Sequence, residues 1–531
     1  QLKRWLWSPL IDIDHINQRL DCVAFLLSQT GQDALTTQLE PHFKQIGDLE
    51  RKIAQLHCSM NRFSIHKFHL LTVSIQALCL TIEALQSHEG FSSQDAPQLL
   101  LNTVQHVCDL QLHTTIRAFY QPYLSYVGGQ PVFVPQQGIS AEFDQVVAEI
   151  QQIKATLDAH LCQIQTQLNC TSIKYVHRMK DRYQIEILER ERVAVPSHFV
   201  LMSKTKAARR YYDNEIPSLV SKLDQLEEDK AQLADSLFQM FIATFDQRFY
   251  AQLQQAIACL STIDCLCAFA QRVRTYGGQG YNRPDLKPPK DQAILQVTGL
   301  WHPLVAQRLI QQGGTFIPND IDLSLDCVAL LTGANMSGKS TFLRSVGVMV
   351  ILAQVGMFVP AKQCILTPRH RIFTRMGASD QLVRNQSTFL VEMLETSVIL
   401  NEANAQSLIL IDELGRGTST FDGLAIAYAV VDTLSTDICA PTIFSTHLHS
   451  LTEQLAECKN IQQLHPDYFL DKENGDAVTF LYSLVKGPCP GSFGLNVASM
   501  AGIPQSITQR AEEKARLLKR ERFRLIFADN K

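Results

Sequence analysis

Apolar residues recur at intervals of three and four along most of the first 275 residues, which is the spacing of one helix face. The helices predicted by this spacing are 15–28, 43–59, 66–88 and 141–168. Asp14 is a predicted N-cap of the first of them. A longer stripe predicts one helix, or two in series, over 213–275. Its members are Leu219, Leu223, Leu226, Leu233, Leu237, Phe241 and Phe245.

The pattern changes between residues 170 and 212. Residues 183–187 alternate in polarity like a strand, and 174–210 contain ten Lys or Arg against four Asp or Glu. This basic segment lies between two helical arms, as at the end of a hairpin. It is either a solvated surface or a contact for nucleic-acid phosphates. The residues that we consider for DNA contact are Lys174, Arg178, Lys204, Lys206, Arg209 and Arg210.

A Gly- and Pro-rich stretch over 276–289 is the clearest domain boundary. After it, apolar runs of strand length alternate with helical patterns to about residue 503. This alternation predicts a mostly parallel α/β domain. The length of 531 residues suggests about three or four domains in all.

Composition adds little that is specific. The net charge of −4 gives no global sign of nucleic-acid binding, so a basic surface must be local. Fourteen Cys without zinc-site spacing favour a reducing compartment. No signal peptide is evident, and the apolar stretch 346–360 is too short to cross a bilayer, so we expect no membrane partner. Because both ends look cut, we expect a fragment of a longer protein.

The stretch Gly333–Ser340 fits the phosphate-binding pattern G-x-x-x-x-G-K-[ST] at each fixed position. An apolar run precedes it and a helical run follows it, which is the strand–loop–helix context that this loop requires. We expect Gly333 and Gly338 to let backbone N–H groups turn inward around a polyphosphate. Lys339 is then expected on the β- and γ-phosphates, and the Ser340 hydroxyl on Mg²⁺. The alternative is a glycine-rich turn that only resembles such a loop.

Three further features fit the same chemistry. The apolar run 407–412 ends in Asp412 and Glu413, where parallel strands place their ligands. We expect Asp412 to hold Mg²⁺ and Glu413 to act on the attacking water as general base. A second short strand, 442–446, leads to His447, which we expect at the γ-phosphate. Ser387 opens a helical run, as an N-cap or as an anion contact.

Together these stretches resemble the MutS family of DNA mismatch-repair ATPases. The matching stretches are 332–341, 387–396, 412–423 and 445–447, and Leu2–Leu6 looks like the start of the family's core domain. The resemblance implies a multidomain protein: an all-α core and lever domain with a small mixed clamp, then an α/β P-loop ATPase domain of the ABC type. It implies that the chain dimerises, closes on DNA and couples closure to ATP.

The resemblance also implies a domain plan. Residues 1–150 are the helical core and first lever arm, 151–215 the DNA clamp tip, and 216–285 the returning lever helices. Residues 286–503 are the ATPase domain, and 504–531 a truncated dimerisation helix. An N-terminal mismatch-binding domain and most of a connector domain are expected to lie outside this chain.

Carried over position by position, the resemblance implies an ATP and Mg²⁺ site. Glu413, His447 and Asn335 match catalytic positions, and Ser340 and Asp412 match the Mg²⁺ ligands. Ser387 matches a serine that reaches the nucleotide of the partner subunit. The positions expected to bind nucleotide within one chain are Gly333, Ala334, Asn335, Met336, Ser337, Gly338, Lys339, Ser340, Thr341, Phe316 and Tyr482. Phe316 and Tyr482 are expected to stack on adenine.

Two positions depart from the family pattern, because Ala334 and Ser337 replace the usual Pro and Gly. Residues 372–380 look most like the mismatch-recognising subunit of the eukaryotic heterodimer, the MutSα type. That subunit implies double-stranded DNA, a second MutS-family subunit and MutL-type proteins as partners. It implies a nuclear location in a eukaryote, or the cytoplasm and nucleoid otherwise. The alternatives are a MutS-like clamp for recombination junctions and another ABC-type chromosome ATPase.

Overall fold

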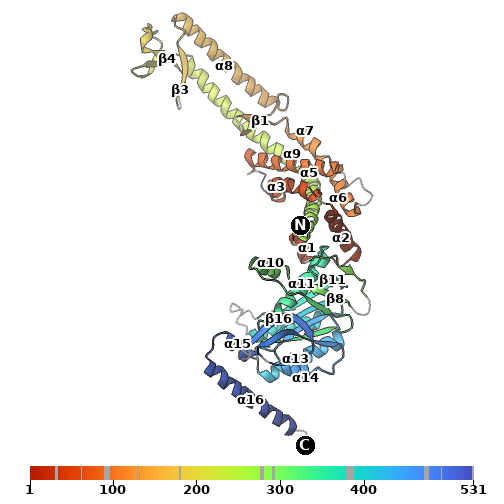
Figure 1. Ribbon diagram of the computed structural model, residues 1–531. Helices are drawn as coiled ribbons and strands as arrows, with labels where there is room; N and C mark the ends of the chain where they lie inside the picture. The colour runs from red at the N-terminus through yellow and green to blue at the C-terminus, as the bar shows by residue number, and fades with distance from the viewer. Residues whose placement is uncertain are drawn as a thin grey trace. The chain divides into compact units, whose positions relative to one another are not determined.

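The chain is described by a computed structural model (Figure 1). The residues it describes are 1–29, 31, 34–60, 63–88, 96–127, 130–178, 181–275, 280–289, 293–377, 388–471, 477–491 and 493–528. They form two compact units. One contains residues 1–38, 88–103 and 261–531, and the other contains residues 39–87 and 104–260.

The first unit is built around a six-stranded sheet of order β12-β13-β14-β10-β15-β16. Its strands are β10 (Val328–Thr332), β12 (Arg371–Arg375), β13 (Ser407–Asp412), β14 (Thr442–Thr446), β15 (Ile461–Asp471) and β16 (Ala477–Lys486). All neighbouring strands run parallel except the last pair, β15 and β16. The predicted α/β domain with a mostly parallel sheet is therefore confirmed.

Both faces of this sheet are buried. Along β10, Ala329 and Leu331 point into one apolar cluster, while Val328 and Leu330 point into another. Successive side chains of a strand alternate between faces, so an uninterrupted apolar run is what a doubly covered strand requires. Helix α11 (Lys339–Val355) covers the first face, and α13 (Thr420–Thr433) with α14 (His449–Gln454) covers the second.

The prediction from sequence did not include a second sheet beyond α11. It has the order β7-β11-β8-β9 and is mixed, with β8 antiparallel to both of its neighbours. Its strands are β7 (Asp285–Leu286), β8 (Leu295–Leu300), β9 (Asn319–Asp322) and β11 (Gln363–Leu366). It shares one apolar cluster with α11, so the helix that follows the glycine-rich loop is packed between two sheets.

Further helices complete this unit. They are α1 (Leu2–Trp7), α2 (Ile13–Ser28), α10 (Pro303–Gln311), α12 (Thr388–Glu402), the π-helical turn η5 (Leu434–Ile438), α15 (Gly494–Met500) and α16 (Gln505–Ala528). Helix α2 packs on α11 through Ile16 and Leu20, and Arg19 donates to the carbonyl of Val355 at 3.0 Å. Asp14 does not cap α2; Asp12 does, because its carboxylate accepts the N–H of His15 at 2.8 Å.

The second unit is mainly helical. Its helices are α4 (Leu49–Cys58), α5 (Ile65–Ser87), α7 (Leu112–Tyr120) and α8 (Ala141–Gln167); α3 (Leu35–Ile46), α6 (Gln98–Asp109) and α9 (Ile216–Thr275) contribute residues to both units. The predicted helix 43–59 is two helices, divided at Gly47, whose φ is 60°. The all-helical prediction for 1–150 missed a hairpin of β1 (Leu124–Val127) and β2 (Gln130–Phe133).

Helix α9 is one continuous helix of 60 residues. Its apolar stripe packs against α8 through Leu223 and Leu226, and further along against α5 and α7 through Phe241 and Phe245. Helices α5 and α9 are long and apolar enough to cross a membrane by length and composition alone. However, 61% and 50% of their most apolar windows are buried inside the protein, as in core helices.

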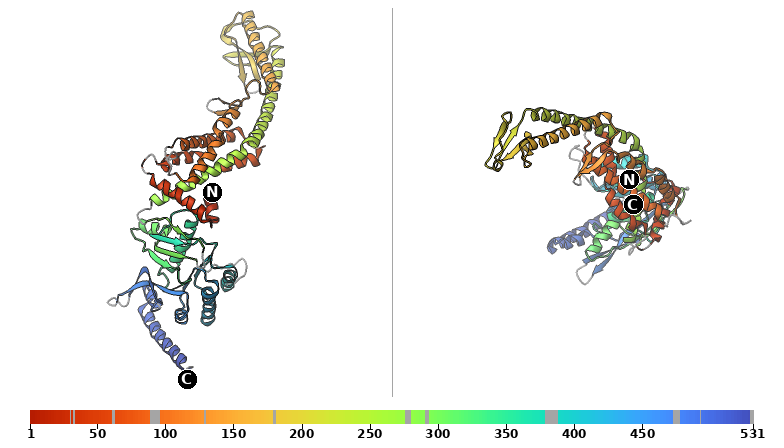
Figure 2. Two further views of the ribbon diagram at one scale, coloured as in Figure 1. Left: turned by 90° about the vertical axis from the view of Figure 1, so that its right-hand side faces the viewer. Right: turned by 90° about the horizontal axis from the view of Figure 1, so that it is seen from above.

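Between α8 and α9 in the chain lies a four-stranded antiparallel sheet, which we call the tip sheet (Figures 1 and 2). Its strands, in the order β3-β4-β6-β5, are β3 (Lys174–Arg178), β4 (Asp181–Leu188), β5 (Val200–Lys204) and β6 (Ala208–Tyr212), with the turn η3 (Glu189–Glu191) after β4. The strand predicted at 183–187 is confirmed. The predicted boundary at residue 150 falls inside α8, which continues to Gln167.

Candidate functional site

The loop between β10 and α11 has the curled backbone that its glycines predict. Gly333 and Gly338 have φ of 153° and 96°, and Met336 is also left-handed at 69°. A Cβ on Gly333 would lie 2.9 Å from Pro466, and one on Gly338 would lie 3.2 Å from the ring of Tyr482. Only glycine combines these angles with such close neighbours. The two glycines therefore let the loop curl tightly before α11 begins at Lys339.

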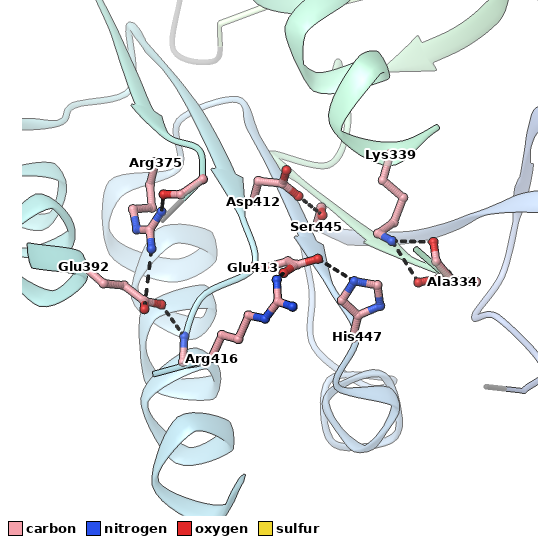
Figure 3. A network of polar contacts seen from close by, with 12 residues as sticks. Ala334, Lys339, Arg375, Glu392, Asp412, Glu413, Arg416, Ser445 and His447 are labelled. Atoms are coloured by element: carbon pink, nitrogen blue, oxygen red, sulfur yellow. Dashed lines mark hydrogen bonds and ion pairs between the residues drawn. The ribbon is translucent and has the colours of Figure 1, made fainter. Parts of the chain in front are cut away.

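Lys339 is the first residue of α11 and is buried. Its Nζ donates to the carbonyls of Gly333 at 2.9 Å and Ala334 at 2.8 Å (Figure 3). Burial lowers the pKa of Lys339 to about 8, and the carboxylates of Glu413 and Asp412 act in the opposite direction. A buried ammonium at a helix N-terminus suits a polyanion.

The two residues that depart from the family pattern, Ala334 and Ser337, are joined by a hydrogen bond within the loop. Ser337 is buried, and its hydroxyl donates to the carbonyl of Ala334 at 2.8 Å. The serine therefore makes a bond across the loop that glycine could not make.

Asp412 and Glu413 stand at the carboxyl end of β13, beside the end of β14. The register pairs Asp412 with Ser445, whose hydroxyl donates to the Asp412 carboxylate at 2.5 Å. Glu413 Oε1 lies 2.5 Å from Nε2 of His447, and Arg416 Nη1 donates to Glu413 Oε2 at 2.7 Å (Figure 3). The ends of β13 and β14 therefore bring Asp412, Glu413 and His447 together.

The environment of Glu413 is unusual in two ways. The hydrogen bond from His447 is the largest cause that lowers the pKa of Glu413 to about 2, and Arg416 and Lys339 lower it further. Its φ of 60° is rare for a residue with a side chain, and such strain of about 1–3 kcal/mol persists only where surrounding contacts impose it. The carboxylate is thus ionised and held in one direction.

A cavity of about 440 Å³ joins the loop to this carboxylate. Its lining includes the predicted residues Phe316, Asn335, Met336, Gly338, Lys339, Ser340, Thr341, Glu413 and Tyr482. Asn319 fixes one wall, because it donates to the carbonyl of Tyr482 at 2.9 Å and accepts from the N–H of Leu484 at 2.6 Å. Aromatic side chains at one part and an ammonium with a helix N-terminus at another fit a nucleotide.

The donor set also fits Mg²⁺. Ser340 supplies a hydroxyl at the start of α11, and Asp412 supplies a carboxylate at the end of β13, which β14 separates from β10 in the sheet. Oxygen ligands of this kind are what Mg²⁺ prefers in phosphate sites. Among the described residues no group of three or more His, Cys, Asp or Glu forms a metal site of its own.

Ser387 lies outside the described residues, as does the part of 372–380 after Gly377. Helix α12 begins directly after Ser387, at Thr388, as the sequence predicted.

The basic residues predicted in 174–210 lie on the tip sheet and its turns, but they are not equivalent. Lys174, Arg178, Lys204 and Lys206 are exposed, while Arg209 is half-buried, 3.5 Å from Glu189. Arg210 is buried, and its guanidinium pairs with Glu186 on the neighbouring strand at 2.7 and 2.8 Å. Arg210 is therefore a structural residue of the sheet, and its prediction as a DNA contact is wrong.

Three polar side chains around Glu413 were assigned no role from the sequence. They are Ser445, Arg416 and Glu392. Side chains alternate along a strand, so Ser445, two residues before His447, could have been predicted to point toward the site as well. Glu392 of α12 is buried and accepts the N–H of Gly415 at 2.5 Å, a contact that no local spacing predicts.

Comparison with known proteins agrees with this geometry. Residues 1–270 match the family model for MutS domain III, and residues 329–519 match the model for MutS domain V. The first match covers half of the chain, and the second contains the loop, Asp412, Glu413 and His447.

Individual relatives point the same way. The chain is 34% identical to DNA mismatch repair protein Msh6 of Gallus gallus and 33% identical to that of Homo sapiens, in each case over 97% of the chain. It is 32% identical to DNA mismatch repair protein MutS of Christiangramia forsetii over 96% of the chain. The chain spans 41%, 40% and 56% of the lengths of these three relatives.

Proposed function

This chain belongs to the MutS family, and from that membership and the cavity geometry we propose that it is the helical and ATPase part of a DNA mismatch-repair protein. The observation that supports this most strongly is that the glycine-rich loop, Glu413 and two aromatic residues line the same cavity. Because the named relatives are mismatch-repair proteins, this function is favoured over a junction clamp or a chromosome-organising ATPase.

The proposed substrate is ATP. Phe316 and Tyr482 would stack on adenine, while Asn335, Lys339 and the loop N–H groups would hold the phosphates. Ser340 and Asp412 would hold Mg²⁺, which supplies charge neutralisation at the phosphates when it is bound. Ser445 orients the Asp412 carboxylate through the hydrogen bond described above. We assign this unit to the ABC type of P-loop ATPases.

Hydrolysis needs a water directed at the γ-phosphate. Glu413 is the proposed general base, and its low pKa keeps the carboxylate ionised at neutral pH, as an acceptor that can orient the water. His447 and Arg416 hold both carboxylate oxygens, which limits the directions that the carboxylate can take. His447 would also contact the γ-phosphate, so that the presence of this phosphate would affect the hydrogen bond between His447 and Glu413.

The second subunit is part of the proposal. Ser387, at the head of α12, would reach the nucleotide of a partner MutS-family subunit, so that each site is completed in trans. The Msh6 relatives favour a heterodimer, nuclear in a eukaryote, with MutL-type proteins acting downstream. Helix α16 would contribute to dimerisation.

The tip sheet is the proposed DNA clamp, with α8 and α9 as its lever arms. Lys174, Arg178, Lys204 and Lys206 are the exposed cations that would contact phosphates of double-stranded DNA. In the full-length protein the DNA would contain a mismatch.

The test is steady-state ATP hydrolysis by the full-length protein with its partner subunit, with and without mismatched duplex DNA. Lys339→Ala is the control, because it removes the ammonium and leaves the loop backbone. We expect DNA-stimulated turnover that is lost in the variant. Turnover that survives Lys339→Ala would contradict the assignment of this cavity.

A further inference from the structure

The helix α12 and the loop that carries Glu413 are joined by a buried charged contact (Figure 3). Glu392 lies one turn into α12 and is only 3% exposed. One of its carboxylate oxygens accepts the N–H of Gly415 at 2.5 Å, and the other lies 3.5 Å from the guanidinium of Arg375. Arg375, at the end of β12, is buried as well and donates to the carbonyl of Gly377 at 2.5 Å. The contact is therefore shielded from water, where charged hydrogen bonds hold geometry best.

The loop 413–417 is packed so closely that it has little freedom to move unless α12 moves with it. A Cβ on Gly417 would lie 2.9 Å from Cβ of Phe389 in the first turn of α12. At Gly415, with φ of 87°, a Cβ would lie 2.7 Å from the carbonyl oxygen of Gly423 in α13. Gly415 is two residues from Glu413, whose own φ of 60° requires outside restraint. The Gly415 N–H is the point at which α12 fixes this strained segment.

We propose that Glu392 is a positioning residue that couples the first turn of α12 to the direction of the Glu413 carboxylate. It does not touch the reacting atoms; it acts by holding the backbone of Gly415. This inference rests on the proposed ATPase function. Because the head of α12 would face the nucleotide of the partner subunit, Glu392 would transmit engagement of the partner's site to the catalytic carboxylate of this one.

The test compares two double variants that differ only in the bond to Gly415. Among the described residues, removing Glu392 alone would leave Arg375 buried beside one other carboxylate, Glu395, whose oxygen is 3.3 Å from Nε, and such a variant can fail to fold. Arg375→Met with Glu392→Gln removes both charges but keeps an oxygen that can accept the Gly415 N–H. Arg375→Met with Glu392→Met removes the charges and the acceptor together.

In the full-length heterodimer we expect the Gln variant to keep kcat within about threefold of the wild type. The Met variant should lose up to about 10²-fold in kcat, the scale of a small misplacement of a catalytic group, with ATP affinity unchanged. Equal kcat in the two variants, or a loss seen only in ATP affinity, would overturn the inference.

Hydrogen exchange of the peptide covering 413–417 separates this inference from the proposed function. We expect faster exchange in the Met variant than in the Gln variant, with or without turnover. Equal exchange in both would overturn the inference alone. Absence of Lys339-dependent turnover in the wild type would overturn the proposed function and the kinetic role of Glu392 with it.

Discussion

At the scale of single residues, the site is defined by side chains with unusual surroundings. A lysine buried against carbonyls and a carboxylate held by a histidine and an arginine both have pKa values shifted from the ordinary range. Perturbed groups of this kind gather at functional sites, because the contacts that restrict a side chain also change its proton affinity. Each of these contacts can be removed separately.

Glu413→Gln is expected to bind ATP with nearly wild-type affinity and to hydrolyse it at least about 10²-fold more slowly. The amide keeps the shape of the side chain but cannot act as a base, a role that contributes about 10²–10⁴-fold. Single-turnover hydrolysis together with fluorescent-nucleotide binding measures both quantities. Hydrolysis at the wild-type rate in this variant would rule out Glu413 as the base.

Tyr482→Ala is expected to weaken nucleotide binding by about 1–3 kcal/mol, the value of one aromatic stack on a base. Tyr482→Phe is the matched control and should bind like the wild type, since stacking needs the ring and not the hydroxyl. Isothermal titration with a non-hydrolysable ATP analogue is the measurement. A large loss in the Phe variant would indicate a polar role for the hydroxyl instead.

At the scale of elements, α9 is stabilised by a run of aromatic contacts. Phe241, Phe245 and Phe249 pack with Phe119 of α7, and the first two also with Phe68 of α5. Edge-to-face and offset rings add stability beyond the area they bury. This part of the apolar stripe is thus a packed seam between α9 and the helices α5 and α7.

Phe245→Ala is expected to lower the free energy of unfolding by about 3–5 kcal/mol, because the ring is 1% exposed and its loss leaves a cavity. Met240→Ala, at a position 61% exposed on the same helix, should change it by less than about 0.5 kcal/mol. Urea denaturation followed by circular dichroism measures both. Similar effects at the two positions would contradict the assigned seam.

The tip sheet carries exposed cations and also one buried arginine, Arg210, which has a structural role. Replacing Lys174, Arg178, Lys204 and Lys206 with Gln should make the log–log salt slope of DNA binding less negative by about 0.9 for each DNA phosphate that is no longer neutralised. Arg210→Met should instead destabilise the sheet, by about 3–5 kcal/mol, since it removes the buried ion pair of Glu186 and leaves that carboxylate with the more distant, exposed Lys174 at 3.8 Å. Binding titrations at several salt concentrations are the measurement, and an unchanged slope in the fourfold variant would mean that these cations are only solvated.

At the scale of the whole molecule, α9 is the longest of the three described helices that contribute residues to both compact units. Residues 216–260 belong to one and residues 261–275 to the other, within a single helix. A continuous helix resists bending. We therefore expect α9 to carry the proposed coupling between DNA binding and ATP hydrolysis.

Gln255→Pro tests this route at an exposed position of α9. Proline removes a helix N–H and clashes with the preceding turn at a cost of about 3 kcal/mol or more. We expect basal ATP turnover to persist while stimulation by DNA is reduced, with Gln255→Ala as the matched control. Full stimulation in the Pro variant would show that α9 need not be intact for the coupling.

The sequence by itself determined the elements whose signals are local. Apolar spacing gave α9 and α11, an uninterrupted apolar run gave β10, and fixed glycines gave the loop at 333–340, because each depends only on residues close in the chain. The same holds for Asp412 and Glu413 at the end of one strand. The resemblance to a family added Phe316 and Tyr482, which spacing could not have paired.

Only the tertiary structure decided which side chains meet. Charge counts placed Arg210 among the surface cations, but strand pairing buries it against Glu186. The bond from Glu392 to Gly415 joins residues 23 apart in different elements, and the second sheet joins strands from 285 to 366. Such contacts depend on register and packing between distant segments, which a pattern read along one stretch of chain does not contain.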